Sequence, residues 1–161
     1  MNANKTHHQL LSTIHALLAC FLVLVISAAP AYAGGVFSTT PGGVAIQGYD
    51  PVAYFTMEKA VKGLKEFTHE WLGTTWQFKS AQHRDMFTDN PIMYAPQHGG
   101  YCSVGVLDGG QYSVDPQAWR VVDGKLYLFY DSSTMASWNP NRPAVAIADE
   151  DWLKTLLDLT Q

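Results

Sequence analysis

Four side chains in the body of this sequence carry the donor atoms that transition metals prefer. They are the imidazoles of His69, His83 and His98 and the thiol of Cys102. His98 and Cys102 are separated by three residues, and two of these are glycines that let the backbone turn tightly. Imidazole and thiolate ligands together suit copper or zinc. These four residues are therefore the candidate metal ligands.

Two other interpretations of the same residues stay open. A histidine on an inward helix face is more often a hydrogen-bonded core group, and Cys102 would equally suit a buried position on a strand. Alternatively, Cys102 is a nucleophile with His83 or His98 as its base, although the sequence offers no third group to orient that base. Because no substrate is indicated either, a non-enzymatic role is the first expectation.

A helix is expected to position His83. Ser80 can cap this helix through its hydroxyl, good helix formers follow at 81–89, and Asn90-Pro91 ends it. His83 then shares one face with Met86 and Phe87, at i, i+3 and i+4, and this face should look inward. In the first turn, the helix macrodipole favours the neutral imidazole that a metal requires.

The remaining elements are predicted from apolar alternation and turn residues. They are short strands around a turn at 44–55, a β-hairpin of 66–71 with 74–78, a strand at 101–106, a second hairpin of 119–122 with 125–130, and helices at 132–138 and 149–159. The last helix should turn Trp152, Leu153, Leu156 and Leu157 inward. The pattern predicts an α+β fold: a small single domain of antiparallel β-hairpins with a few short helices.

Two acidic groups have simpler explanations than ligand binding. Asp50 precedes Pro51, and an Asp-Pro pair is typical of a turn. The acids at 149–151 are expected to open the last helix, where the macrodipole favours negative charge.

Residues 1–33 have the features of a signal peptide. An uncharged apolar run at 10–29 is followed by Pro30 and by the small-x-small pair Ala31 and Ala33, which signal peptidase accepts. An uncleaved membrane anchor is the alternative, since about 20 apolar residues can span a bilayer. Cys20 lies inside the apolar run, so lipid attachment is a minor option. We expect cleavage after Ala33, a flexible lead at 34–43, a domain at 44–161, and no stable membrane span once the signal is removed.

Composition limits which locations and partners are expected for the chain after signal cleavage. Its charge is mildly acidic and its lysines and arginines do not cluster, so no nucleic-acid partner is expected. After cleavage Cys102 is the single cysteine, and one cysteine cannot form an internal disulfide. A periplasmic or secreted location is expected, with a metal ion as partner.

Three blocks of sequence look familiar together. They are residues 48–55 (Gly-Tyr-Asp-Pro-Val-Ala-Tyr-Phe), residues 73–87 with Asn90-Pro91 and Tyr94, and residues 99–105 with 114–116 and 124–130. In this order they resemble the YHS domain family, and the third block resembles its exported bacterial branch. The resemblance covers roughly residues 44–152. It implies a small α+β metal-binding module, related to domains on copper-transporting ATPases and to metal-sensing domains.

The resemblance also ranks the candidate ligands. Metal-binding members of the family carry cysteines at the positions of Ala53, Lys79 and His83, so an imidazole replaces one thiol here. His83 and Cys102 are the expected primary ligands, followed by His98 and then His69. The expected function is a non-enzymatic module that binds copper ion, with zinc as the second choice. The alternatives are a metal-free interaction or scaffold module with a periplasmic protein partner, and a thiol-dependent enzyme that uses Cys102.

Overall fold

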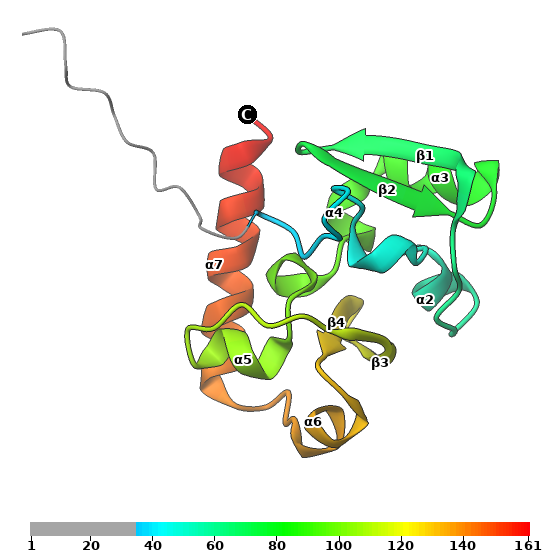
Figure 1. Ribbon diagram of the computed structural model, residues 1–161. Helices are drawn as coiled ribbons and strands as arrows, with labels where there is room; N and C mark the ends of the chain where they lie inside the picture. The colour runs from blue at the N-terminus through cyan, green and yellow to red at the C-terminus, as the bar shows by residue number, and fades with distance from the viewer. Residues whose placement is uncertain (1–34) are drawn as a thin grey trace, which may run out of the picture. The chain divides into compact units, whose positions relative to one another are not determined.

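The computed structural model describes residues 35–161. The predicted signal peptide, including Cys20, and the first residue of the predicted lead lie outside this range. Within it, six α-helices and two antiparallel two-stranded sheets confirm the predicted α+β fold (Figure 1). None of the described helices is long and apolar enough to cross a membrane.

The elements follow one another along the chain as short segments, except for the last helix. In order they are η1 (Ile46–Gly48), α2 (Ala53–Thr56), β1 (Leu64–Trp71), β2 (Thr74–Phe78), α3 (Ala81–Asp89), α4 (Pro91–Tyr94), η2 (Gln97–Gly100), α5 (Ser103–Leu107), β3 (Asp115–Val122), β4 (Lys125–Phe129), α6 (Ser132–Ser137) and α7 (Pro143–Leu159).

Both predicted hairpins are confirmed, and each closes through a two-residue turn. β1 pairs with β2 up to Trp71 and Thr74, and β3 pairs with β4 up to Val122 and Lys125. Both residues of each turn, Leu72-Gly73 and Asp123-Gly124, have positive φ angles, which suits the right-handed twist of the flanking strands. The long strands begin earlier than predicted, at residues 64 and 115, because a register irregularity lets pairing resume beyond the regular ladder.

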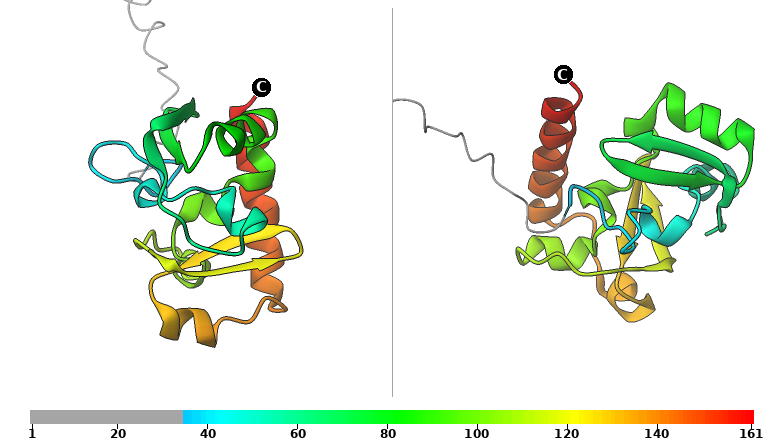
Figure 2. Two further views of the ribbon diagram at one scale, coloured as in Figure 1. Left: turned by 90° about the vertical axis from the view of Figure 1, so that its right-hand side faces the viewer. Right: turned by 45° about the horizontal axis from the view of Figure 1, so that its top comes forward.

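Helix α3 forms as predicted and covers the first hairpin (Figure 2). The Ser80 hydroxyl accepts a hydrogen bond from the backbone amide of His83 at 3.2 Å, so it caps the helix. Phe87 is fully buried against Trp76, with ring centroids 5.0 Å apart. Burying one phenylalanine side chain contributes about 2–3 kcal/mol, so this contact anchors α3 on the sheet.

The chain before the first hairpin is less extended than predicted. Instead of strands at 44–55, it forms the single turn η1 and the short helix α2. The Asp50 carboxylate causes the difference, because it accepts hydrogen bonds from backbone amides at the start of the helical turn. Phe37, in the predicted lead, is buried in the aromatic core beside Trp76.

The predicted strand at 101–106 is wrong, because the chain forms helix α5 there. Gly99 and Gly100 both have positive φ angles and turn the chain just before this segment. Only an isolated bridge from Cys102 to Leu128 remains of the expected strand. Val104 has a high strand propensity, but its packing against the core prevails.

The last helix differs from its prediction in both length and orientation. α7 begins at Pro143, six residues before the predicted start, and proline suits the first helical turn. Leu156 is buried as predicted, but Leu153 and Leu157 are 47% and 45% exposed. The buried face is formed by Val145, Asp149 and Leu156, so Leu153 and Leu157 lie at its edge.

Candidate functional site

His83 belongs to a buried network centred on Asp50. Its Nδ1 lies 2.6 Å from Asp50 Oδ2, and its Nε2 lies 3.3 Å from the Thr56 hydroxyl. The Asp50 side chain is inaccessible to solvent and also accepts hydrogen bonds from three backbone amides, those of Val52, Ala53 and Lys79, at 2.8, 3.2 and 2.9 Å.

This network ties three elements together. Asp50 joins the start of α2 to the end of β2 and, through His83, to α3. Both nitrogens of the His83 ring have partners within the protein, so a metal ion at Nε2 would have to replace the Thr56 contact. The arrangement matches the hydrogen-bonded core histidine that was the alternative interpretation.

His98 is held by a second aspartate, from α7. Its Nε2 lies 3.1 Å from Asp149 Oδ1, and its side chain is 1% exposed. Burial lowers the pKa of His98 below its ordinary value, although the negative charge of Asp149 opposes this shift. The neutral ring therefore donates its proton from Nε2 to the carboxylate. Nδ1 is left with a lone pair that no described group contacts by a hydrogen bond.

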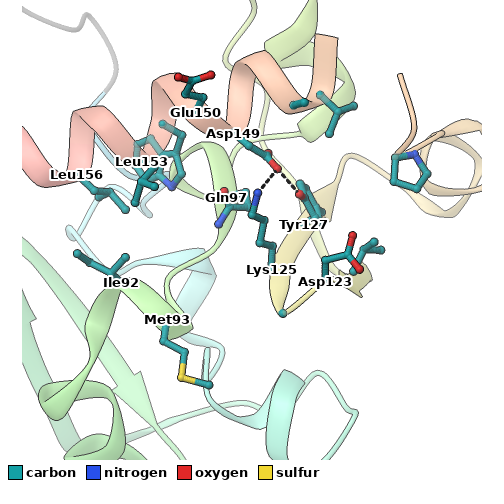
Figure 3. Close-up of a pocket in the computed structure, with 16 residues that line it drawn as sticks. Ile92, Met93, Gln97, Asp123, Lys125, Tyr127, Asp149, Glu150, Leu153 and Leu156 are labelled. Carbon is teal, nitrogen blue, oxygen red and sulfur yellow. Dashed lines mark hydrogen bonds and ion pairs between the residues drawn. The ribbon is translucent and has the colours of Figure 1, made fainter. Parts of the chain in front are cut away.

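The other oxygen of Asp149 is held from strand β4. Lys125 Nζ lies 2.7 Å from Oδ2, and the Tyr127 hydroxyl lies 2.6 Å from the same atom, as the dashed lines in Figure 3 show. Burial raises the pKa of Tyr127, and the hydrogen bond and charge of Asp149 add to this effect. The phenol thus stays protonated and donates. Asp149 therefore accepts from three donors, and we call these four residues the Asp149 cluster.

Three residues of the Asp149 cluster, Lys125, Tyr127 and Asp149, form part of the wall of a pocket of about 530 Å³. Most of the lining comes from α4, the β3–β4 hairpin and α7. The lining residues are Ile92, Met93, Gln97, Val122, Asp123, Gly124, Lys125, Tyr127, Pro140, Val145, Ala146, Asp149, Glu150, Trp152, Leu153 and Leu156. Apolar side chains dominate this set, with a few polar groups placed among them (Figure 3).

The other two predicted ligands lie in different surroundings. Cys102 is 3% exposed at the start of α5, and its backbone amide donates to the Tyr112 carbonyl at 3.1 Å. His69 lies on β1, with its ring centroid 6.2 Å from that of Phe87. Among residues 35–161, no three histidine, cysteine or acidic side chains are grouped so that they could hold a metal ion.

The two aspartates are the site residues that sequence reasoning passed over. Asp50 is a turn residue as expected, but its carboxylate is also the partner of His83. Asp149 does not open a helix, because α7 begins six residues earlier. A signal was present nonetheless: Asp149 shares the helical spacing of the buried residues Val145 and Leu156, so an acid lies on an apolar face.

These features define a small α+β domain in which an aspartate, a lysine and a tyrosine of one hydrogen-bonded cluster form part of the wall of a pocket. The chain matches none of the protein-family models, curated proteins or solved structures with which it was compared. The resemblance to the YHS domain family is thus carried by the three sequence blocks alone.

Proposed function

We propose that this chain is an exported, non-enzymatic binding module that holds a small molecule in the pocket beside α7. The pocket carries the proposal, because its volume of about 530 Å³ lies in the range of small-molecule sites, roughly 300–1,000 Å³. Such sites combine an apolar lining with a few fixed polar groups, and the Asp149 cluster supplies these groups. Export to the periplasm and membership of the YHS domain family are part of the same proposal, supported by residues 1–33 and by the three sequence blocks.

The Asp149 cluster is suited to orienting a ligand. Three hydrogen bonds, from three different side chains, fix the carboxylate before any ligand arrives. Lys125 is partly exposed and uses one hydrogen bond for Asp149, so its ammonium group has further protons to donate. A rigid polar wall of this kind lowers the ordering cost of binding.

The position of the one cysteine in the described part of the chain counts against the thiol-dependent enzyme that was one alternative. Cys102 is buried, and no side-chain hydrogen bond of residues 35–161 involves its thiol. A nucleophilic cysteine needs an accessible thiolate beside a base.

A pocket-filling variant tests the proposal. Ala146 is exposed and lines the pocket, so Ala146→Phe should occupy the cavity without disturbing the core. Ala136→Phe is the matched control, since Ala136 is an exposed helical alanine outside the lining. The probe is N-phenyl-1-naphthylamine, a neutral apolar dye whose fluorescence rises on burial. We expect Ala146→Phe to weaken dye binding at least tenfold and Ala136→Phe to leave it unchanged. Equal binding by all three proteins would overturn the proposal.

Transition-metal binding is the second candidate, with copper preferred to zinc. The observation that favours it is the unpartnered Nδ1 of His98, on a ring whose Nε2 is fixed by Asp149. Metal-binding histidines typically donate their other nitrogen to a carboxylate in this way. The sequence ranked His98 after His83 and Cys102, and this unpartnered nitrogen is the reason to place it first. Cys102, four residues later, is the proposed second ligand, with His83 and His69 as further candidates.

Metal titration under reducing conditions tests this second candidate. Near-stoichiometric copper(I) that is lost in His98→Ala or Cys102→Ser would support it. A protein that takes up no copper or zinc, or whose uptake survives both variants, would contradict it.

A further inference from the structure

The pocket beside α7 carries an excess of negative charge. Its charged lining residues are three acids, Asp123, Asp149 and Glu150, and one base, Lys125. Lys125 and Asp149 form an ion pair at 2.7 Å, so their charges largely cancel. Asp123 and Glu150 are exposed, and neither forms an ion pair within residues 35–161. Two uncompensated carboxylates therefore set the electrostatic character of the pocket.

The two exposed carboxylates come from different elements of the pocket wall. Figure 3 shows Glu150 on α7 and Asp123 at the β3–β4 turn, with Asp149 and Tyr127 drawn between them. Because an apolar, low-dielectric wall weakens the screening of charge, two carboxylates at one cleft attract cations and repel anions.

The part of the pocket away from Asp123 is largely apolar. Ile92 and Leu156 are drawn away from Asp123 in Figure 3, and Leu153 lies near them. A ligand that fits both parts has a hydrocarbon body and a single charged end. The two aromatic residues of the lining, Tyr127 and Trp152, can also interact favourably with a cation through their ring faces.

On these grounds we infer that the pocket is selective for an organic cation with an apolar body, such as a protonated aryl-alkyl amine. This inference rests on the proposed function and specifies its ligand class. The apolar part buries the hydrocarbon, and the carboxylates of Asp123 and Glu150 compensate the ammonium charge. An anion would gain only from Lys125, whose charge is already paired with Asp149.

Three probes of matched size test this selectivity by calorimetry at pH 7. They are 1-naphthylmethylamine, which is protonated, 1-naphthylmethanol, which is neutral, and 1-naphthoate, which is an anion. We expect the ammonium probe to bind about tenfold more tightly than the alcohol, and the anion to bind more weakly than the alcohol. Raising the salt concentration should reduce the advantage of the ammonium probe and leave the alcohol unchanged.

Charge-neutral variants show which carboxylates attract the ammonium probe. Glu150→Gln and Asp123→Asn should each reduce the affinity for the ammonium probe about threefold without changing that for the alcohol. Asp151→Asn is the control, because Asp151 is exposed, lies next to Glu150 on α7 and is outside the lining. An equal effect of Asp151→Asn would overturn the inference, since the attraction would then come from the general charge of the surface.

The outcomes separate this inference from the proposed function. If all three probes bind equally, or the anion binds best, the pocket binds ligands but the inferred selectivity is wrong. If neither the probes nor the neutral dye binds, the proposed function fails and the inference fails with it.

Discussion

Replacing Asp149 by asparagine tests how the Asp149 cluster holds the fold together. The change keeps the shape of the side chain but removes its charge and one of its two acceptor oxygens. In the native protein the carboxylate accepts hydrogen bonds from three donors, which lie on η2 and β4: the Nε2 of His98, the ammonium of Lys125 and the hydroxyl of Tyr127. The amide cannot satisfy all three.

The loss of stability is the sum of what each of the three donors loses. For Tyr127, a charge-assisted hydrogen bond is replaced by a neutral one, which costs about 1 kcal/mol. Lys125 is 44% exposed on its side chain, so water compensates most of its loss and it adds about 0.5 kcal/mol or less. The amide oxygen best serves Lys125 and Tyr127, so its NH₂ faces His98, which must either point its Nε2 proton at that group or move it to Nδ1, which has no acceptor. Either way one buried N–H stays unpaired, at about 1–3 kcal/mol.

The expected loss for Asp149→Asn is thus about 2–4 kcal/mol in the free energy of unfolding, or a fall in Tm on the order of 10 °C for a domain of this size. Urea unfolding followed by tryptophan fluorescence measures it. Asp151→Asn, on the exposed side of the same helix, should change stability by less than about 0.5 kcal/mol. A loss for Asp149→Asn as small as that of the control would refute the assignment of Asp149 as the organising acceptor.

Three further predictions follow from other contacts. Because burial lowers the pKa of His98, the unfolded chain binds its proton more readily than the folded protein does. Stability should therefore fall as the pH drops from about 7 through the unfolded pKa of about 6.5, and the fall should be smaller in His98→Gln. Ser80→Ala removes the cap on the His83 amide and should cost about 1 kcal/mol, measured by urea unfolding. Gly99→Ala should cost more than about 2 kcal/mol, because its Cβ would lie 2.1 Å from the Val36 carbonyl oxygen at a positive φ angle.

Each of these predictions has its own control. For the pH effect, an identical stability profile in His98→Gln would exclude His98 as the source. Ser80→Thr keeps a hydroxyl cap and should retain most of the stability that Ser80→Ala loses. Gly109→Ala also has a positive φ angle but meets no atom within 4 Å, so it should cost less than Gly99→Ala. Equal costs at the two glycines would show that the contact with Val36 is unimportant.

The elements that were predicted correctly depend on signals close together in the sequence. Asp123 and Gly124 specify a tight turn by themselves, and Ser80 caps the helix that begins at the next residue. By contrast, α5 is stabilised by packing against β4 and α7. These contacts are distant in the sequence, so the residues around Cys102 do not predict them. Strand propensity at Val104 then gave the wrong prediction.

The candidate site, too, was predictable only where the signal is local in the sequence. Imidazoles could be selected from the sequence because few residue types bind metals, and both His83 and His98 do lie in buried polar networks. Their partners could not be identified, since Asp50 lies 33 residues from His83, and Asp149 lies 51 residues from His98. Only the fold determines which of the fourteen acidic residues meets which ring.

The position of Asp149 also limits the order in which the domain can fold. Its partners on η2 and β4 precede it in the chain by 22 to 51 residues. Until α7 has been synthesised and has docked, His98 and Tyr127 have no acceptor, so burying them would cost free energy that nothing repays. Closing these long loops is also entropically slow. The part of the chain before α7 is therefore expected to stay loosely packed during synthesis, a state that would suit the export proposed for this chain.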